Sequence, residues 1–151
     1  MRRLRHFLSD QSGNASLEFI TTGIVLLLPM VYLILVMASI QGGALAAESA
    51  ARQAARVYVQ APTESQAVFE AQEAAAFALA DYGINPSELA LAISCEPRPR
   101  TCLTRRGTVT VDVTVTVPLP LVPQAFRDAV PLSVPVRSTA TVQVSRFWGS
   151  R

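Results

Sequence analysis

The sequence has one histidine, His6, close to the start of the 151-residue chain. The rest of the chain therefore has no histidine for a Ser-His-Asp triad, a Cys-His pair or a histidine-ligated metal site. Glu64, Glu70 and Glu73 recur at helical spacing, which is typical of a solvated helix face rather than of a catalytic acid pair. We expect no catalytic residues, metal, cofactor or small-molecule substrate, and the chain is not expected to be an enzyme.

Lysine is absent, so all 13 basic side chains are arginines, and they stand against 11 acidic residues. Three of the arginines and one aspartate fall within residues 1–13, which leaves ten residues of each sign in the rest of the chain. A nucleic-acid-binding domain needs a net basic surface. The neutral remainder therefore argues against a nucleic-acid partner.

Charge is almost missing from residues 17–40, where Glu18 is the one ionised side chain in a 24-residue apolar run. At about 1.5 Å per residue such a helix is roughly 36 Å long, enough to cross a hydrocarbon core of about 30 Å with some tilt. Pro29 is the one helix breaker in this run. The run predicts a single transmembrane helix.

The flanks of the apolar run predict its orientation. Three arginines at positions 2, 3 and 5 precede it, whereas residues 41–47 after it carry no basic side chain. The positive-inside bias places the N-terminus in the cytoplasm and the C-terminal part outside it, in a single-pass cell-membrane protein. The alternative is a cleaved secretory signal with Ala44 and Ala46 at its cleavage site, but such signals have apolar stretches of only about 7 to 15 residues.

Cysteine is scarce, and both cysteines, Cys95 and Cys102, fall on the expected outer side of the membrane. A metal site would need further ligands that the surrounding sequence does not supply. In an oxidising compartment, two cysteines this close favour a disulfide. Closure of a loop of about 8 residues stabilises the fold by about 2.5 kcal/mol in the chain-entropy model.

Glycine interrupts the helical pattern after the membrane run, at Gly42 and Gly43. Because each glycine costs a helix up to about 1 kcal/mol relative to alanine, the pair marks either a flexible point or a tight contact. An alanine-rich helix is expected over residues 44–59, and Pro62 ends it.

A second helix is predicted between Thr63 and Gly83. Thr63 and Gln66 form a capping pattern, and Gly83 is expected to adopt the left-handed conformation that ends many helices. Its apolar face, expected to cover a sheet, consists of Val68, Ala71, Ala75, Ala78, Leu79 and Tyr82.

Beyond Gly83 the apolar residues alternate with a period of two, which predicts three strands with one buried face each. The expected inward residues are Leu89, Leu91, Ile93 and Cys95, then Val109, Val111, Val113, Val115 and Val117, then Val134, Val136, Ala140, Val142 and Val144. Prolines confine the connection between the second and third strands to irregular structure, with one helical turn over 124–129, and Pro135 favours a sheet edge.

These patterns predict an α+β fold. A transmembrane helix continues into an extracytoplasmic helix, and a second amphipathic helix packs on a small antiparallel sheet of about three strands. The expected parts are a basic leader over 1–13, a transmembrane and juxtamembrane helix over 14–60, and an extracytoplasmic domain over 61–151. A fragment from about Thr63 to Arg151 is expected to fold alone.

The N-terminal region resembles a known family. Residues 10–19, Asp-Gln-Ser-Gly-Asn-Ala-Ser-Leu-Glu-Phe, lead directly into the apolar run, and an Ala/Arg stretch follows over 50–56. This arrangement is similar to the TadE-like minor pseudopilins of tight-adherence pili. The resemblance covers residues 1 to about 60, and the Gly-x4-Glu spacing before an apolar helix carries most of it.

The resemblance implies a processing site and an assembly site. A prepilin peptidase would cut between Gly13 and Asn14, which makes Glu18 the fifth mature residue and Phe19 its neighbour in the assembly region. The implied partners are the membrane, other pilin or pseudopilin subunits and the pilus assembly platform. The alternative from the residues alone is that Gly13 is a turn residue and Glu18 an interfacial acid that extends toward water.

Four arginines, Arg98, Arg100, Arg105 and Arg106, surround the cysteine pair. They form either a solvated loop or a contact for an acidic partner or lipid headgroups. Three classes of function follow for the chain. The first is a pilin-like subunit in tight-adherence pilus assembly or a related secretion apparatus, the second is a signal-anchored extracytoplasmic binding domain, and an enzyme comes last.

Overall fold

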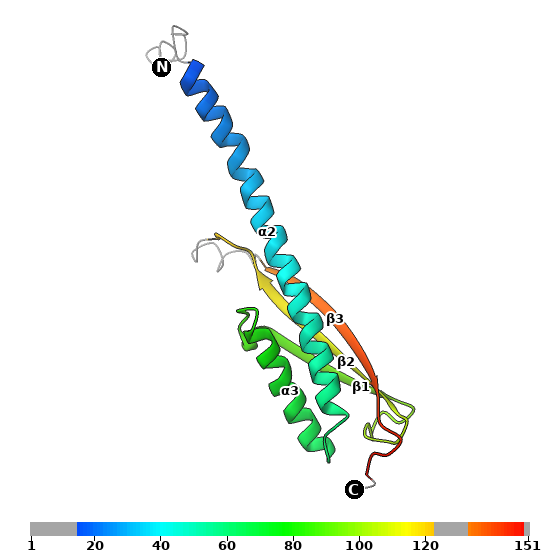
Figure 1. The fold of residues 1–151 in the computed structure, drawn as a ribbon. Helices are drawn as coiled ribbons and strands as arrows, with labels where there is room; N and C mark the ends of the chain where they lie inside the picture. The colour runs from blue at the N-terminus through cyan, green and yellow to red at the C-terminus, as the bar shows by residue number, and fades with distance from the viewer. Residues whose placement is uncertain (1–14, 123–132, 150–151) are drawn as a thin grey trace, which may run out of the picture. The chain divides into compact units, whose positions relative to one another are not determined.

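The computed structural model describes residues 15–122 and 133–149. The elements in chain order are α2 (Ala15–Tyr58), α3 (Glu64–Ala80), the short 3₁₀ helix η1 (Pro86–Glu88), β1 (Leu89–Glu96), β2 (Thr108–Pro118) and β3 (Ser133–Gln143) (Figure 1). The chain divides into two compact units, Met1–Leu35 and Val36–Arg151. The fold is α+β, as predicted.

Helix α2 runs without a break through Pro29 and through both glycines. Among the described residues, it is the one helix that is long and apolar enough to cross a membrane. The two alternatives for the glycine pair are resolved in favour of a tight contact. A Cβ atom at Gly43 would lie 2.2 Å from Cγ2 of Val117 on β2, whereas one at Gly42 would meet nothing within 4 Å.

The three strands form one antiparallel sheet in the order β1-β2-β3, so β2 lies in the centre. Val113 of β2 pairs with Leu91 on one side and with Ser138 on the other, and the same register carries the predicted inward residues within β1, β2 and β3 to one face. Val144, also predicted to face inward, follows the end of β3 and is buried. Pro135 lies on the edge strand β3, as expected. The helical turn expected over 124–129 falls outside the described residues.

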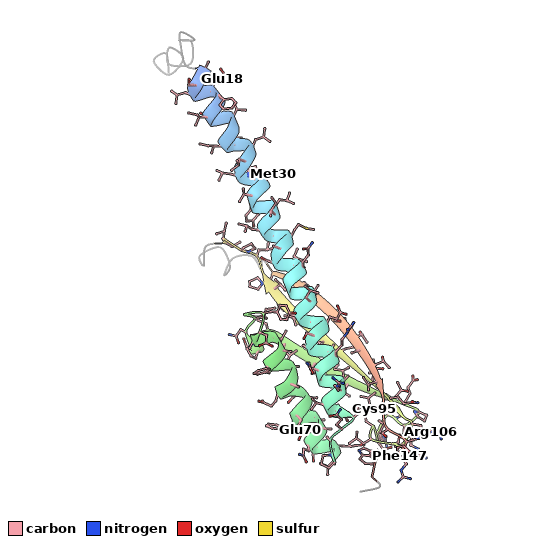
Figure 2. All side chains as sticks on the ribbon, in the orientation of Figure 1. Glu18, Met30, Glu70, Cys95, Arg106 and Phe147 are labelled. Atoms are coloured by element: carbon pink, nitrogen blue, oxygen red, sulfur yellow. A yellow bond between two sulfur atoms is a disulfide. The ribbon has the colours of Figure 1, made fainter. Side chains whose placement is uncertain are left out.

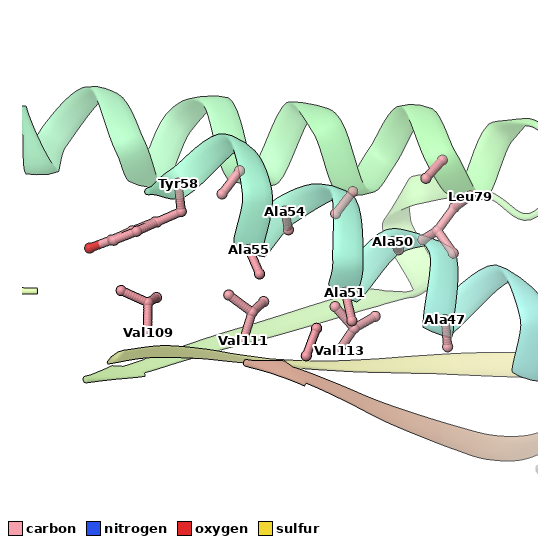
Figure 3. Packing of buried hydrophobic residues seen from close by; sticks show 14 of the residues in the cluster. Ala47, Ala50, Ala51, Ala54, Ala55, Tyr58, Leu79, Val109, Val111 and Val113 are labelled. Atoms are coloured by element: carbon pink, nitrogen blue, oxygen red, sulfur yellow. The ribbon is translucent and has the colours of Figure 1, made fainter. Parts of the chain in front are cut away.

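Both helices of the second unit lie on the valine face of the sheet. Ala47, Ala51 and Ala55 of α2 point toward the valines of β2 (Figure 3). The five inward valines of β2 are buried, four of them completely. Alanine is the residue that permits this geometry, because its small side chain lets the helix backbone approach the valine face closely.

Helix α3 begins and ends as the sequence predicts. The Thr63 hydroxyl accepts a hydrogen bond from the Gln66 backbone N–H at 3.3 Å. At the other end Gly83 has a φ of 69°, and the Ile84 N–H donates to the Leu79 carbonyl at 3.1 Å, which completes a Schellman-type cap.

The buried face of α3 is rotated from the predicted one. Its buried residues are Ala67, Ala71, Ala75, Ala78 and Leu79. Val68 and Tyr82, assigned to this face from the sequence, are 41% and 47% exposed, so that part of the prediction was wrong. Alanines on a line four residues apart bring α3 close to its neighbours, and Val68, about 100° further round the helix, falls outside the contact.

The compact second unit starts earlier than the domain expected over 61–151. Eight buried residues come from α2, in the stretch from Gly43 to Tyr58, and its alanines and Tyr58 belong to the same core cluster as the valines of β2. The compact second unit therefore includes the last turns of α2, and we expect a fragment that folds alone to begin before Thr63.

Candidate functional site

The N-terminal candidate residues lie on α2 where the structure describes them. Glu18 is in the first turn of the helix and Phe19 follows it, and both side chains are exposed within the chain. The proposed cleavage site, Gly13 and Asn14, lies outside the described residues. Figure 2 shows Glu18 at the start of the helix, well before Met30 in the apolar run.

The apolar run of α2 presents large side chains outward on all sides. Phe19 is 79% exposed, Leu26 68% and Leu33 63%, and no residue of α2 before Val36 is buried. An exposed apolar surface of this kind is typical of a helix that lies in a bilayer or packs against other apolar helices.

The two cysteines are joined. Cys95 and Cys102 form a disulfide with a Cα–Cα distance of 5.2 Å, and it closes the start of the connection between β1 and β2. This confirms the pairing predicted from their spacing.

Replacing Cys95 with Ser is expected to lower the free energy of unfolding by about 2 to 3 kcal/mol, because the unfolded chain regains the entropy of the open loop. Urea unfolding of both proteins is measured without reductant, so that the wild-type bridge stays closed, and at low protein concentration and mildly acidic pH, which suppress bridges between variant molecules. Cys102→Ser should cost the same amount, and the double variant should cost no more than either single one. Thiol labelling of both cysteines in the untreated native protein would contradict the pairing.

A partly buried contact that the sequence did not predict ties α3 to the residue that follows the disulfide loop. An oxygen of the Glu64 carboxylate accepts a hydrogen bond from the Leu103 backbone N–H at 3.3 Å. Tyr58 lies nearby in the core, where burial, and secondarily the charge of Glu64, raise the pKa of its phenol. Glu64 is thus a structural acid, whereas the other two glutamates of α3 remain on its outer side.

The four predicted arginines all lie at one end of the sheet, where β1 ends and β2 begins. Arg98 and Arg100 are in the loop closed by the disulfide, and Arg105 and Arg106 are in the turn before β2. All four side chains are exposed. Figure 2 shows Arg106 near Cys95 and near Phe147 of the C-terminal segment.

The C-terminal segment adds a fifth arginine to this end. Arg146 lies over the ring of Phe147, with its guanidinium carbon 4.6 Å from the ring centroid. The Trp148 indole N–H donates to the Ala61 carbonyl at 3.0 Å, and the Trp148 carbonyl accepts from Nε of Arg105 at 2.9 Å. These bonds join the segment to the connection between α2 and α3 and to the turn before β2. We call Arg98, Arg100, Arg105, Arg106 and Arg146 the arginine cluster.

A shallow groove lies beside the cluster, lined by Val59, Gln60, Ala61, Pro62, Ser145, Phe147, Trp148 and Gly149. Sequence reasoning missed it because its walls are separated by more than 80 residues in the chain. Among the described residues, no group of three or more His, Cys, Asp or Glu side chains is placed to hold a metal ion.

Comparison of the chain with protein-family models, with curated proteins and with solved structures gives no match.

Proposed function

We propose that the chain is a TadE-like, membrane-anchored minor pseudopilin that takes part in the assembly of a tight-adherence pilus or a related secretion apparatus. The proposal is supported by the Gly13-x4-Glu18 spacing, by the exposed apolar surface of α2 and by the continuation of this helix into the core of a disulfide-bonded α+β unit. The apolar helix is stored in the bilayer, and assembly transfers it into a bundle of similar helices.

The proposed orientation keeps residues 1–13 in the cytoplasm and the second unit outside it. The arginines at positions 2, 3 and 5 favour this orientation, and the Cys95–Cys102 disulfide is typical of an oxidising compartment. A prepilin peptidase, other pilin or pseudopilin subunits and the assembly platform are the partners that this function requires.

Glu18 is the observation that carries the proposal, because it is the one charged side chain between Ala15 and Ala47 on α2. A carboxylate near the bilayer centre costs about 2.5 to 3.5 kcal/mol. The positive N-terminus of the helix returns only about 0.3 to 1 kcal/mol. An assembled bundle therefore needs a cation for Glu18, and cleavage after Gly13 creates one, the α-amino group of Asn14, on the same chain or on a neighbour.

Glu18→Ala is expected to leave membrane insertion and folding intact and to abolish incorporation into the assembly. Fibre or secretion output is compared with wild type at matched expression levels. The matched control is Glu48→Ala, which removes an exposed acid further along α2 that pairs with Arg52. Normal output from the Glu18→Ala cells would refute the pairing mechanism.

Leader processing separates this function from the rival, a domain merely tethered by its helix. Mass spectrometry of the mature protein should find an N-terminus at Asn14, and Gly13→Leu should leave a longer, membrane-bound form. An intact leader in the wild-type protein, together with normal output from Glu18→Ala, would favour the tethered binding domain, whose ligand site would then be the groove beside Trp148.

A further inference from the structure

The charges of the second unit are segregated along the chain. Residues 57–97 contain six acidic side chains and no basic one, whereas residues 98–151 contain eight arginines and two acids. Surfaces of soluble domains usually mix both signs. Here the acidic stretch includes the whole of α3, and five arginines of the basic stretch form the arginine cluster.

The outer side of α3 carries an aromatic–acid–aromatic line. Phe69, Glu73 and Phe77 follow one another at intervals of four residues, so they lie on one ridge of the helix. The two phenylalanines are 64% and 74% exposed although much smaller alanines fill the core. We call these three residues the α3 ridge.

The chemistry of the α3 ridge fits an arginine. A guanidinium forms charge-assisted hydrogen bonds with a carboxylate and also stacks on aromatic rings. Glu73, with a phenylalanine one turn before it and another one turn after it, offers both interactions at one place. Within the described residues the ion pairs are Glu48–Arg52 and Asp112–Arg137, so none of the described arginines pairs with Glu73.

The arginine cluster is the complementary surface. The backbone of Arg106 is held in place, because its N–H donates to the Val144 carbonyl at 3.2 Å and its carbonyl accepts from Nε2 of Gln143 at 3.2 Å. Its side chain remains exposed and without an acidic partner among the described residues. A fixed backbone under a free guanidinium lowers the entropy cost of binding.

We propose that the α3 ridge of one copy of this chain receives the arginine cluster of a second copy. The two surfaces differ, so the contact is head-to-tail and leaves a free ridge and a free cluster for further copies. This contact would order the copies within the proposed assembly. It rests on the proposed function, which gives the copies a common orientation in one membrane.

The geometry sets the offset between neighbouring copies. Glu64 is bonded to Leu103 at the cluster end of the unit, and Glu73 is nine residues further along α3, about 14 Å by helix rise. Parallel copies displaced by about this distance bring the cluster of one level with Glu73 of the next. A single helix ridge buries little area, so the contact is weak between dilute copies and depends on their high local concentration in a shared micelle or an assembled bundle.

Energy transfer between full-length copies in mixed detergent micelles tests the proposal, because a micelle does not hold neighbouring copies at one height. Donor and acceptor dyes are placed at the N-terminus, and transfer is measured against the protein-to-detergent ratio at low salt. Glu73→Arg alone and Arg106→Glu alone should each weaken self-association on the order of fivefold to tenfold, because like charges then face each other. Glu88→Arg, which reverses an exposed acid away from the ridge, should have no effect. Unchanged Trp148 emission verifies folding of each variant.

Mixing the two variants gives the decisive result. When E73R copies carry the donor and R106E copies carry the acceptor, each contact between unlike copies again joins opposite charges, so transfer should return. Transfer by E73R equal to that of E88R, or no recovery in the mixture, would overturn the proposal. If only this contact is wrong, Glu18→Ala still abolishes assembly in cells. If the proposed function is wrong, cells with Glu18→Ala assemble normally.

Discussion

A fragment that begins at Thr63 is expected to remain largely unfolded, while one that begins at Val36 folds. The shorter fragment lacks the stretch of α2 from Gly43 to Tyr58, whose buried alanines cover the valine face of β2. Exposing the five inward valines costs on the order of 8 to 15 kcal/mol at about 1.5 to 3 kcal/mol each. That is comparable to the whole stability of a typical domain, about 5 to 15 kcal/mol.

Circular dichroism and urea unfolding of both fragments under oxidising conditions measure the difference. The Val36–Arg151 fragment should give mixed helix and strand signals and one cooperative transition, and the shorter one should give neither. A synthetic peptide of residues 36–62, added to the shorter fragment, should restore part of the transition because it supplies the missing layer. A cooperative transition in the shorter fragment alone would show that α3 and the sheet suffice.

The strands and the disulfide were predictable because their physical signals are local. Valine and threonine alternate through β2 at the period of a strand, and this pattern determines both the strand and its buried face. Cys95 and Cys102 are so close in the chain that few alternatives to their pairing exist. Thr63 and Gly83 likewise mark the ends of α3 through capping chemistry that depends on a few neighbouring residues.

The faces of α3 were harder to predict because both sides of the helix are apolar. Hydrophobic periodicity identifies a buried face only where polar residues occupy the opposite one. The predicted Ala71, Ala75, Ala78 and Leu79 do face the core, but Val68 and Tyr82 do not, and the large Phe69 and Phe77 face outward, so hydrophobicity alone misplaces the edges of the buried face. Close helix packing selects small residues, and the sequence does not reveal which apolar face meets the neighbouring helix.

The candidate site also has parts that could be predicted from the sequence and parts that could not. The four arginines flank the cysteines in the sequence, so their gathering at one end of the sheet could be anticipated. Arg146 and the bond from Trp148 to Ala61 could not, because they depend on where the chain returns after β3. The sequence predicts Glu64 to be a solvated acid. Its hydrogen bond to Leu103 could not be predicted, because the two residues are 39 positions apart and no helical pattern relates them.

Adjacent glycines of α2 are expected to respond to alanine with opposite signs. At Gly42 a Cβ meets nothing within 4 Å, so Gly42→Ala should stabilise the fold by about 0.5 to 1 kcal/mol through helix propensity. At Gly43 a Cβ would lie 2.2 Å from Cγ2 of Val117, a side chain that is itself 5% exposed. Overpacking of this kind costs about 1 to 3 kcal/mol, which outweighs the same helix gain.

Urea unfolding of the full-length protein in micelles, followed by the emission of Trp148, measures both variants, since Trp148 is the one tryptophan of the chain. Val117→Ala tests the cause, because it removes the methyl group that Gly43→Ala would strike. The double variant Gly43→Ala/Val117→Ala should be more stable than the sum of the two single effects predicts, by about 0.5 to 3 kcal/mol of coupling. Gly42→Ala combined with Val117→Ala should show no such coupling. Equal effects of alanine at positions 42 and 43 would mean that α2 does not approach β2 as closely as the 2.2 Å contact requires.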